Sequence, residues 1–161
     1  MFLPVLTLLL LASCRSTNPW SVDRVTSGNT KFNSTKLTHF TNDPIHGLDL
    51  EFLKTHDRLY VYLNVHSTPI PPLKTDPESS FVYISVESEK HRFEAHRREG
   101  GQRLLLPDSA VELIISSLEQ QHPITIHVAG YQSLIAPSEF SKQYQKIKQS
   151  PLFENPFHLP F

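Results

Sequence analysis

The sequence of 161 residues has one cysteine, few glycines and no excess of charge of either sign. A single cysteine excludes a disulfide framework and any metal site built from several thiolates. The 15 Lys and Arg residues nearly balance the 16 Asp and Glu residues, so we expect no nucleic-acid partner. The glycines form no phosphate-binding loop, because Gly100 and Gly101 stand in a predicted hairpin turn and not between a strand and a helix.

The most apolar segment is too short to cross a membrane. Residues 1–12 read MFLPVLTLLLLA, whereas a spanning helix needs roughly 20 apolar residues, and this shorter length is typical of a signal-peptide core. The segment ends in Leu11-Ala12-Ser13-Cys14, so the one cysteine follows an apolar residue and two small ones. These four residues resemble the lipobox of bacterial lipoproteins.

The resemblance implies how the chain is processed and where it resides. In such lipoproteins the signal peptide, here residues 1–13, is cleaved before the cysteine, and Cys14 then carries a thioether-linked diacylglycerol. Several acyl chains hold a protein stably on a bilayer, because each buried methylene contributes about 0.8 kcal/mol. Arg15 follows the cysteine, which resembles an outer-membrane address in the bacterial cell envelope. The alternative is that residues 1–12 form the first strand or helix of the domain, with Cys14 an ordinary buried thiol.

Residues 14–36 differ in composition from the rest of the chain. They are rich in Ser, Thr and Asn, and their sparse apolar residues follow no period. Such a segment buries too little surface to offset the entropy lost on ordering, which predicts a flexible tether. Trp20 is the exception within it. This residue either docks on the folded domain, which we favour, or lies among lipid headgroups.

Residues 37–150 predict a β-rich globular domain, mainly β within the α+β class. Apolar and polar residues alternate in several segments, which is typical of half-buried strands. The segments are joined mostly by short polar turns, which favours antiparallel pairing. Together they predict an antiparallel β-sandwich or a barrel-like sheet with one or two packed helices. The clearest predicted strands are 48–52, 59–66, 81–87, 91–97, 103–106 and 124–128.

Two segments have the period of a helix. The first begins after Pro107, where Ser109 and Glu112 have the spacing of a capping box. Its apolar stripe consists of Val111, Ile114, Ile115 and Leu118. A second, shorter helix is predicted over 138–148, and the Pro-rich segment 151–161 is predicted to be an irregular tail. The run 107–131 is similar in pattern to the helix-then-strand segment of periplasmic β-sandwich proteins of the invasion-associated type, which bears on the fold alone.

The sequence has no motif for covalent catalysis. It lacks the Gly-x-Ser-x-Gly turn of serine hydrolases, and its one cysteine is predicted to be acylated. Two pairs of carboxylates alternate along predicted strands, Asp49 with Glu51 and Glu87 with Glu89. We interpret both pairs as solvated charges on an exposed face. We therefore expect no catalytic residue and no cofactor.

Nine histidines raise the question of a metal site. The close pairs His91/His96 and His122/His127 are five residues apart. That spacing puts the two members on opposite faces of a strand, so neither pair can chelate a metal locally. His66 can still meet His127 across neighbouring strands, joined by an acidic residue. We expect scattered surface histidines and no metal site.

Four aromatic residues share the strand faces opposite the aliphatic ones: Tyr60, Tyr62, Phe81 and Tyr83. A second layer such as the second helix covers them in one interpretation. Left uncovered, they form a contiguous apolar patch that binds a ligand or partner. The following hairpin, 90–103, interleaves basic and acidic residues and is interpreted as a solvated sheet edge.

Three functions are compatible with these features. The first is a lipid-anchored envelope protein, held on the membrane and binding another envelope protein or component, or serving a structural role. The second is an envelope hydrolase whose site is assembled from scattered His, Asp and Glu residues. The third is a carrier of small ligands that uses the four aromatic residues, and it requires an open apolar pocket.

Overall fold

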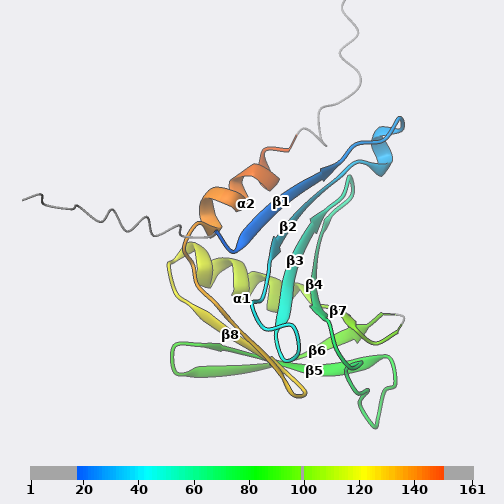
Figure 1. Cartoon of the computed structure of the whole chain (residues 1–161), viewed down its shortest axis with the longest axis vertical. Helices are drawn as coiled ribbons and strands as arrows, with labels where there is room; N and C mark the ends of the chain where they lie inside the picture. Colours follow the sequence, from blue (N-terminus) through cyan, green and yellow to red (C-terminus); the bar gives the residue numbers. More distant parts are fainter. Residues whose placement is uncertain (1–17, 99, 151–161) are drawn as a thin grey trace, which may run out of the picture.

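The computed structural model describes residues 18–98 and 100–150. The predicted signal peptide, Cys14 and the predicted tail at 151–161 lie outside the described residues. Strands dominate the chain order, and the two α-helices come late in it (Figure 1). The elements are β1 (Trp20–Val25), η1 (Thr30–Phe32), β2 (Ser34–His39), β3 (Leu48–Lys54), β4 (Leu59–Val65), β5 (Ser79–Val86), β6 (Glu89–Arg97), β7 (Arg103–Leu105), α1 (Asp108–Glu119), β8 (Ile124–Val128), β9 (Tyr131–Ile135) and α2 (Phe140–Lys148).

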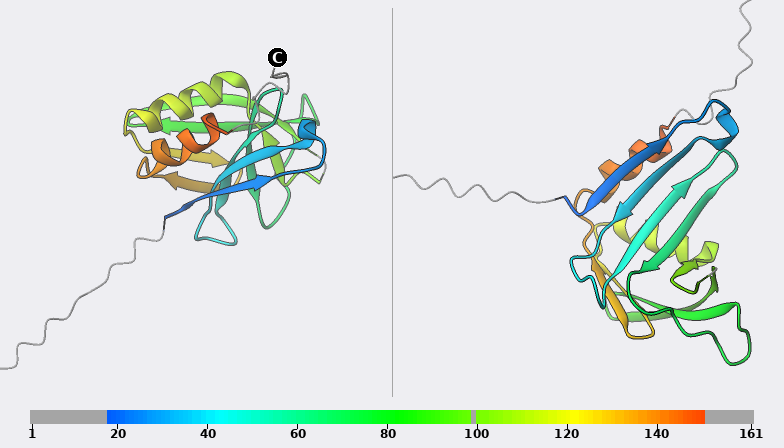
Figure 2. Two further views of the ribbon diagram at one scale, coloured as in Figure 1. Left: turned by 90° about the horizontal axis from the view of Figure 1, so that it is seen from above. Right: turned by 45° about the vertical axis from the view of Figure 1, so that its right-hand side comes forward.

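The described strands form one sheet in the order β1-β2-β3-β4-β7-β6-β5-β8-β9. Every neighbouring pair is antiparallel, which confirms the predicted antiparallel, β-rich α+β fold. The sheet is curved but not closed into a barrel, and its concave side faces the two helices (Figure 1, Figure 2). The second layer of the described domain is helical, so of the two predicted alternatives the curved sheet with packed helices is the one observed, and not the sandwich.

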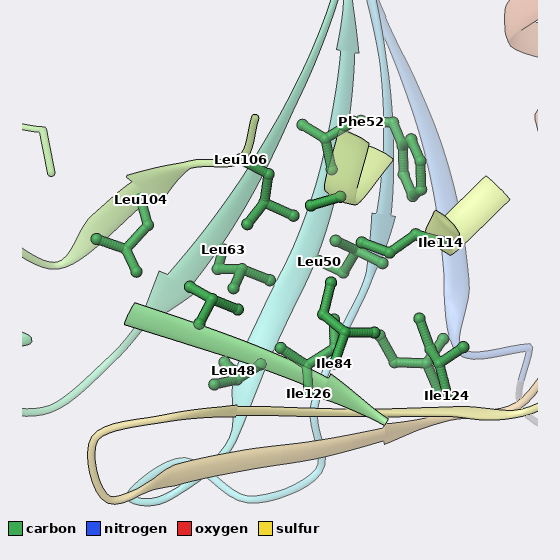
Figure 3. Packing of buried hydrophobic residues seen from close by; sticks show 14 of the residues in the cluster. Leu48, Leu50, Phe52, Leu63, Ile84, Leu104, Leu106, Ile114, Ile124 and Ile126 are labelled. Atoms are coloured by element: carbon green, nitrogen blue, oxygen red, sulfur yellow. The ribbon is translucent and has the colours of Figure 1, made fainter. Parts of the chain in front are cut away.

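The core fills the concave side of the sheet (Figure 3). Alternate residues of β3, namely Leu48, Leu50 and Phe52, are fully buried there. Ile124 and Ile126 of β8 repeat the same alternation. Full burial of one such side chain contributes roughly 1.5–3 kcal/mol to the stability of the fold. The apolar positions of the period-two pattern are therefore the ones that face the helices.

Helix α1 packs through the predicted stripe. Ile114 and Leu118 are fully buried, and the rest of the stripe is partly buried against the same core. The predicted capping box is wrong, because the helix begins at Asp108 and places Ser109 inside the first turn, without a side-chain hydrogen bond at the cap. The carboxylate of Asp108 instead lies where the helix dipole favours negative charge. Neither described α-helix is long and apolar enough to cross a membrane.

The prediction of a flexible tether over 14–36 is wrong for the described part of that segment. Residues 20–25 form β1, which pairs along its whole length with β2. Trp20 is 4% exposed, and its ring lies 5.1 Å from that of Phe140 in α2. This confirms that Trp20 docks on the domain. Val22, two residues after Trp20, also packs partly against the core, and the other residues of this edge strand are held mainly by backbone pairing with β2.

Candidate functional site

The candidate site is built around residues 40–47, which join β2 to β3 and which we call the 40–47 loop. One carboxylate oxygen of Asp43 accepts the backbone N–H groups of Ile45 and His46, both at 2.9 Å. These two bonds lower the pKa of Asp43 below its ordinary value. The Asp43 N–H in turn donates to Thr41 Oγ1 at 3.1 Å. These three hydrogen bonds fix the turn of the backbone, although the side chains of the loop are largely exposed.

Gly47 closes the loop because no other residue fits there. Its N–H donates to the Asp43 carbonyl oxygen at 3.1 Å, which draws the backbone tightly together. A β-carbon at position 47 would collide with Thr41 Oγ1 and the Asp43 carbonyl oxygen. The position thus requires glycine for close approach of the chain and not for an unusual backbone angle.

Asp49 joins the loop to a histidine on the next strand. The Asp49 side chain is buried, and its Oδ1 accepts the Thr41 N–H at 2.8 Å. Its Oδ2 lies 2.8 Å from Nε2 of His66, whose side chain is about half exposed. Asp49 stands opposite Asn64 in the β3–β4 register, so His66, two residues further on, meets it on the same face of the sheet.

Asp49 and His66 line an open hollow of about 550 Å³. Two smaller hollows, of about 320 and 200 Å³, adjoin the same loop and reach strand β9. A hydrogen bond of 2.9 Å from the Gln132 N–H of β9 to the His46 carbonyl oxygen joins the two elements. The other residues of the largest hollow are Phe40, Thr41, Asn42 and Pro44. A ligand at this place would meet one aromatic ring, one amide and the Asp49–His66 pair.

His39 lies beneath the loop and is 6% exposed. Its Nδ1 has no hydrogen-bond partner on another described residue, and its ring meets that of Trp20 edge to face at 4.8 Å. Burial lowers the pKa of His39 below 6.5, while the negative charge of Asp49 and a contact with its own backbone oppose the shift. His39 therefore lies at the inner wall of the 320 Å³ hollow in surroundings that favour the neutral imidazole.

The predicted aromatic site is not formed as one patch. Tyr60 and Tyr62 lie on β4, whereas Phe81 and Tyr83 lie on β5, and β7 and β6 separate the two strands. The prediction that the second helix covers these four residues is also wrong, because α2 packs on β1 and β2. None of the four lines a hollow around the 40–47 loop.

Basic side chains cover the four rings instead. The cationic groups lie 3.8–4.7 Å from the ring centroids: Arg58 over Tyr60, Arg103 over Tyr62, Arg92 over Phe81 and Lys90 over Tyr83. Strand β6, which supplies two of these cations, runs between β7 and β5. The predicted solvated edge hairpin is therefore an interior part of the sheet, and its charges cover aromatic rings.

The Asp49–His66 pair was not expected from the sequence. Asp49 and Glu51 were predicted to be solvated, but Asp49 is paired with His66, and Glu51 with Arg103. The possible meeting of His66 with His127 across neighbouring strands is not formed, because His127 stands opposite Tyr83 on β8, which does not neighbour β4. If the two strands beside the 55–58 turn are paired residue by residue outward from the turn, residue 49 stands opposite residue 64. The sequence could therefore have placed Asp49 near His66. In the described ranges no three His, Cys, Asp or Glu side chains are grouped so that they could hold a metal ion.

Comparisons with protein-family models, with curated proteins and with solved structures found no match for this chain.

Proposed function

We propose that this protein is a lipid-anchored component of a bacterial cell envelope whose domain binds another envelope component. Support for the anchor comes from the order of residues Leu11-Ala12-Ser13-Cys14 after an apolar segment. The described domain begins shortly after Cys14, at β1. An acylated Cys14 would hold this domain on the membrane, with the outer membrane favoured by Arg15.

The binding role rests on one observation, the ordered and exposed 40–47 loop beside the hollow of Asp49 and His66. A loop held by its own hydrogen bonds loses little conformational entropy when a partner binds. Phe40 is 49% exposed at the mouth of this hollow, which offers apolar contact next to polar groups. Binding sites commonly combine such surfaces.

The anchor is tested by replacing the one thiol. Cys14→Ser should abolish incorporation of labelled palmitate and move the protein from the membrane to the soluble fraction. Equal membrane partitioning of the parent and Cys14→Ser would contradict the lipid anchor.

The binding role is tested by cross-linking in cells. A photoreactive amino acid at Asn42, on the exposed loop, should give discrete adducts that mass spectrometry can identify. Phe40→Ala should reduce those adducts, whereas Phe32→Ala, at the opposite end of β2, should leave them unchanged. The same adducts from a probe at Val25, on the far end of β1, would show that the loop is not a specific site.

A second candidate function, hydrolysis of an envelope polymer, is favoured by the Asp49–His66 hydrogen bond. A buried carboxylate that orients an exposed imidazole is the arrangement of a general base. Purified protein should then release soluble fragments from labelled peptidoglycan, His66→Ala should not, and His91→Ala should retain the activity. Absence of release by the parent protein would remove this candidate.

A further inference from the structure

The exposed apolar side chains of the described domain lie at two ends of it. The large hydrophobic residues that are most exposed are Val25, Phe32, Phe40, Ile45 and Leu134. The first two belong to the β1–η1 end. The other three, which we call the apolar triad, are 49%, 58% and 66% exposed and belong to the 40–47 loop and to β9.

Two members of the apolar triad, Phe40 and Leu134, lie beside the point where the described chain begins. The Phe40 N–H donates to the Pro19 carbonyl oxygen at 3.0 Å. Pro19, Phe40 and Leu134 line the same hollow. The start of β1, the 40–47 loop and β9 lie on one side of the molecule, with η1 at the far end (Figure 2).

The covalent distance from Cys14 sets how far this side can be from the membrane. Residues 15–18 separate Cys14 from Pro19, and five chain steps span at most about 18 Å. Asn33 and the six residues of β2 separate Phe32 from Phe40, and the strand alone adds about 20 Å to the other end. A lipid on Cys14 therefore holds the apolar triad near the bilayer and allows Val25 and Phe32 to lie much further away.

We propose that the apolar triad rests on the surface of the bilayer that carries the anchor, with Phe40, Ile45 and Leu134 inserted among lipid headgroups. This inference rests on the proposed acylation of Cys14. Three partly exposed side chains bind a bilayer weakly by themselves, but the anchor keeps them at a high effective concentration beside it.

The polar residues around the triad indicate which lipids it meets. The 40–47 loop carries Asn42, Asp43 and His46 and contains no Lys or Arg. Anionic lipids attract clusters of basic residues, so this surface fits zwitterionic headgroups such as phosphatidylethanolamine. The hollow of Asp49 and His66 then opens next to the membrane, because Phe40 belongs to both features.

The one thiol allows a direct test that does not depend on acylation in the cell. The chain from Cys14 onward is coupled through that thiol to phosphatidylethanolamine–phosphatidylcholine vesicles that contain a maleimide lipid. A lipid with a photoreactive group near its headgroup is then activated, and labelled peptides are mapped by mass spectrometry. We expect labelling of residues 37–47 and 131–136 and little labelling of residues 26–34.

Two matched variants separate docking from mere proximity. Phe40→Ser with Ile45→Ser and Leu134→Ser should reduce labelling of the loop several-fold, while Val25→Ser with Phe32→Ser should leave it unchanged. Equal labelling at both ends, unchanged labelling of the triple variant, or cross-links to a second copy in place of lipid would overturn the proposal. Because the coupling supplies the anchor, such results would not bear on acylation, which the palmitate experiment tests separately.

Discussion

Aromatic rings occur on both sides of the sheet, and the two sides hold them by different interactions. On the concave side, Phe52 lies with its ring centroid 5.7–6.2 Å from the rings of three other aromatic residues: Trp20, Phe140 and Tyr144. On the convex side, Tyr60, Tyr62, Phe81 and Tyr83 are each covered by an Arg or Lys side chain.

The difference shows that one residue type can have two structural roles on one sheet. The concave cluster joins β1, β3 and α2, which are distant in sequence, so its stability comes from burial and ring contacts. The convex rings contact nearby cations, and Tyr60, Phe81 and Tyr83 stay partly exposed, whereas Tyr62 is buried beneath Arg103. Rings buried in the core should therefore contribute much more to stability than rings covered by cations.

The largest expected effect comes from removing the central ring of the concave cluster. Phe52→Ala should lower the free energy of unfolding by about 3–5 kcal/mol, because a fully buried ring leaves a cavity. Phe81→Ala, the matched change on the convex side, should lower it by about 1 kcal/mol. Urea unfolding of both variants measures the difference, and equal losses would remove the distinction between the two sides.

A smaller effect is expected at Arg103, which contacts both Tyr62 and Glu51. Arg103→Met should lower the free energy of unfolding by about 1–2 kcal/mol, because it removes the cation over the ring and leaves the nearly buried carboxylate of Glu51 without its counter-charge. Adding Glu51→Gln should restore part of the loss. A double-mutant cycle that gives no coupling between the two positions would contradict this account.

An exposed cation on the convex side should matter still less. Lys90 lies 4.5 Å from the centroid of the Tyr83 ring at the exposed end of β6. Lys90→Met should lower the free energy of unfolding by about 0.5 kcal/mol in the same urea experiment. A loss as large as that of Arg103→Met would mean that exposure does not weaken these contacts.

The smallest effect is expected at His39, which should change the free energy of unfolding only below neutral pH. His39 is buried and its pKa is lowered below 6.5, so the unfolded chain binds a proton there more readily than the folded one. The free energy of unfolding should thus fall as pH decreases below about 6.5 and be independent of His39 above it. His39→Gln should flatten this part of the profile, and His91→Gln, at a partly exposed position, should not. Identical profiles for parent and His39→Gln would contradict the assignment.

The fold class was predictable because it depends on local periods. Alternation at Leu48, Leu50 and Phe52 indicated a strand with one buried face, and the 3.6 period at Ile114 and Leu118 indicated α1. Strand β1 was missed because it is held by pairing with β2 and by contacts with α2, which is distant in sequence. Strand β9 was missed because the polar Ser133 occupies one of its buried positions.

The candidate site was harder to predict than the fold. Asp49 looks like any polar residue of an alternating strand, and nothing local indicates that the Thr41 N–H and His66 cover it. Aromatic residues on one strand face were correctly placed there, but the sequence pattern does not show that β7 and β6 separate them. Such information resides in strand order and register, which composition does not encode.

At Gly47 a single hydrogen atom stands where other residues have a β-carbon. The position of Thr41 and its hydrogen bond to Asp49 both depend on this close approach of the chain. Any larger residue must displace Thr41, and with it the N–H group that Asp49 accepts. Among all substitutions in the loop, those at position 47 should therefore be the least tolerated, while neighbouring exposed positions accept many residue types. Variation of this surface can change what it contacts without loss of its shape, provided that this one position is kept.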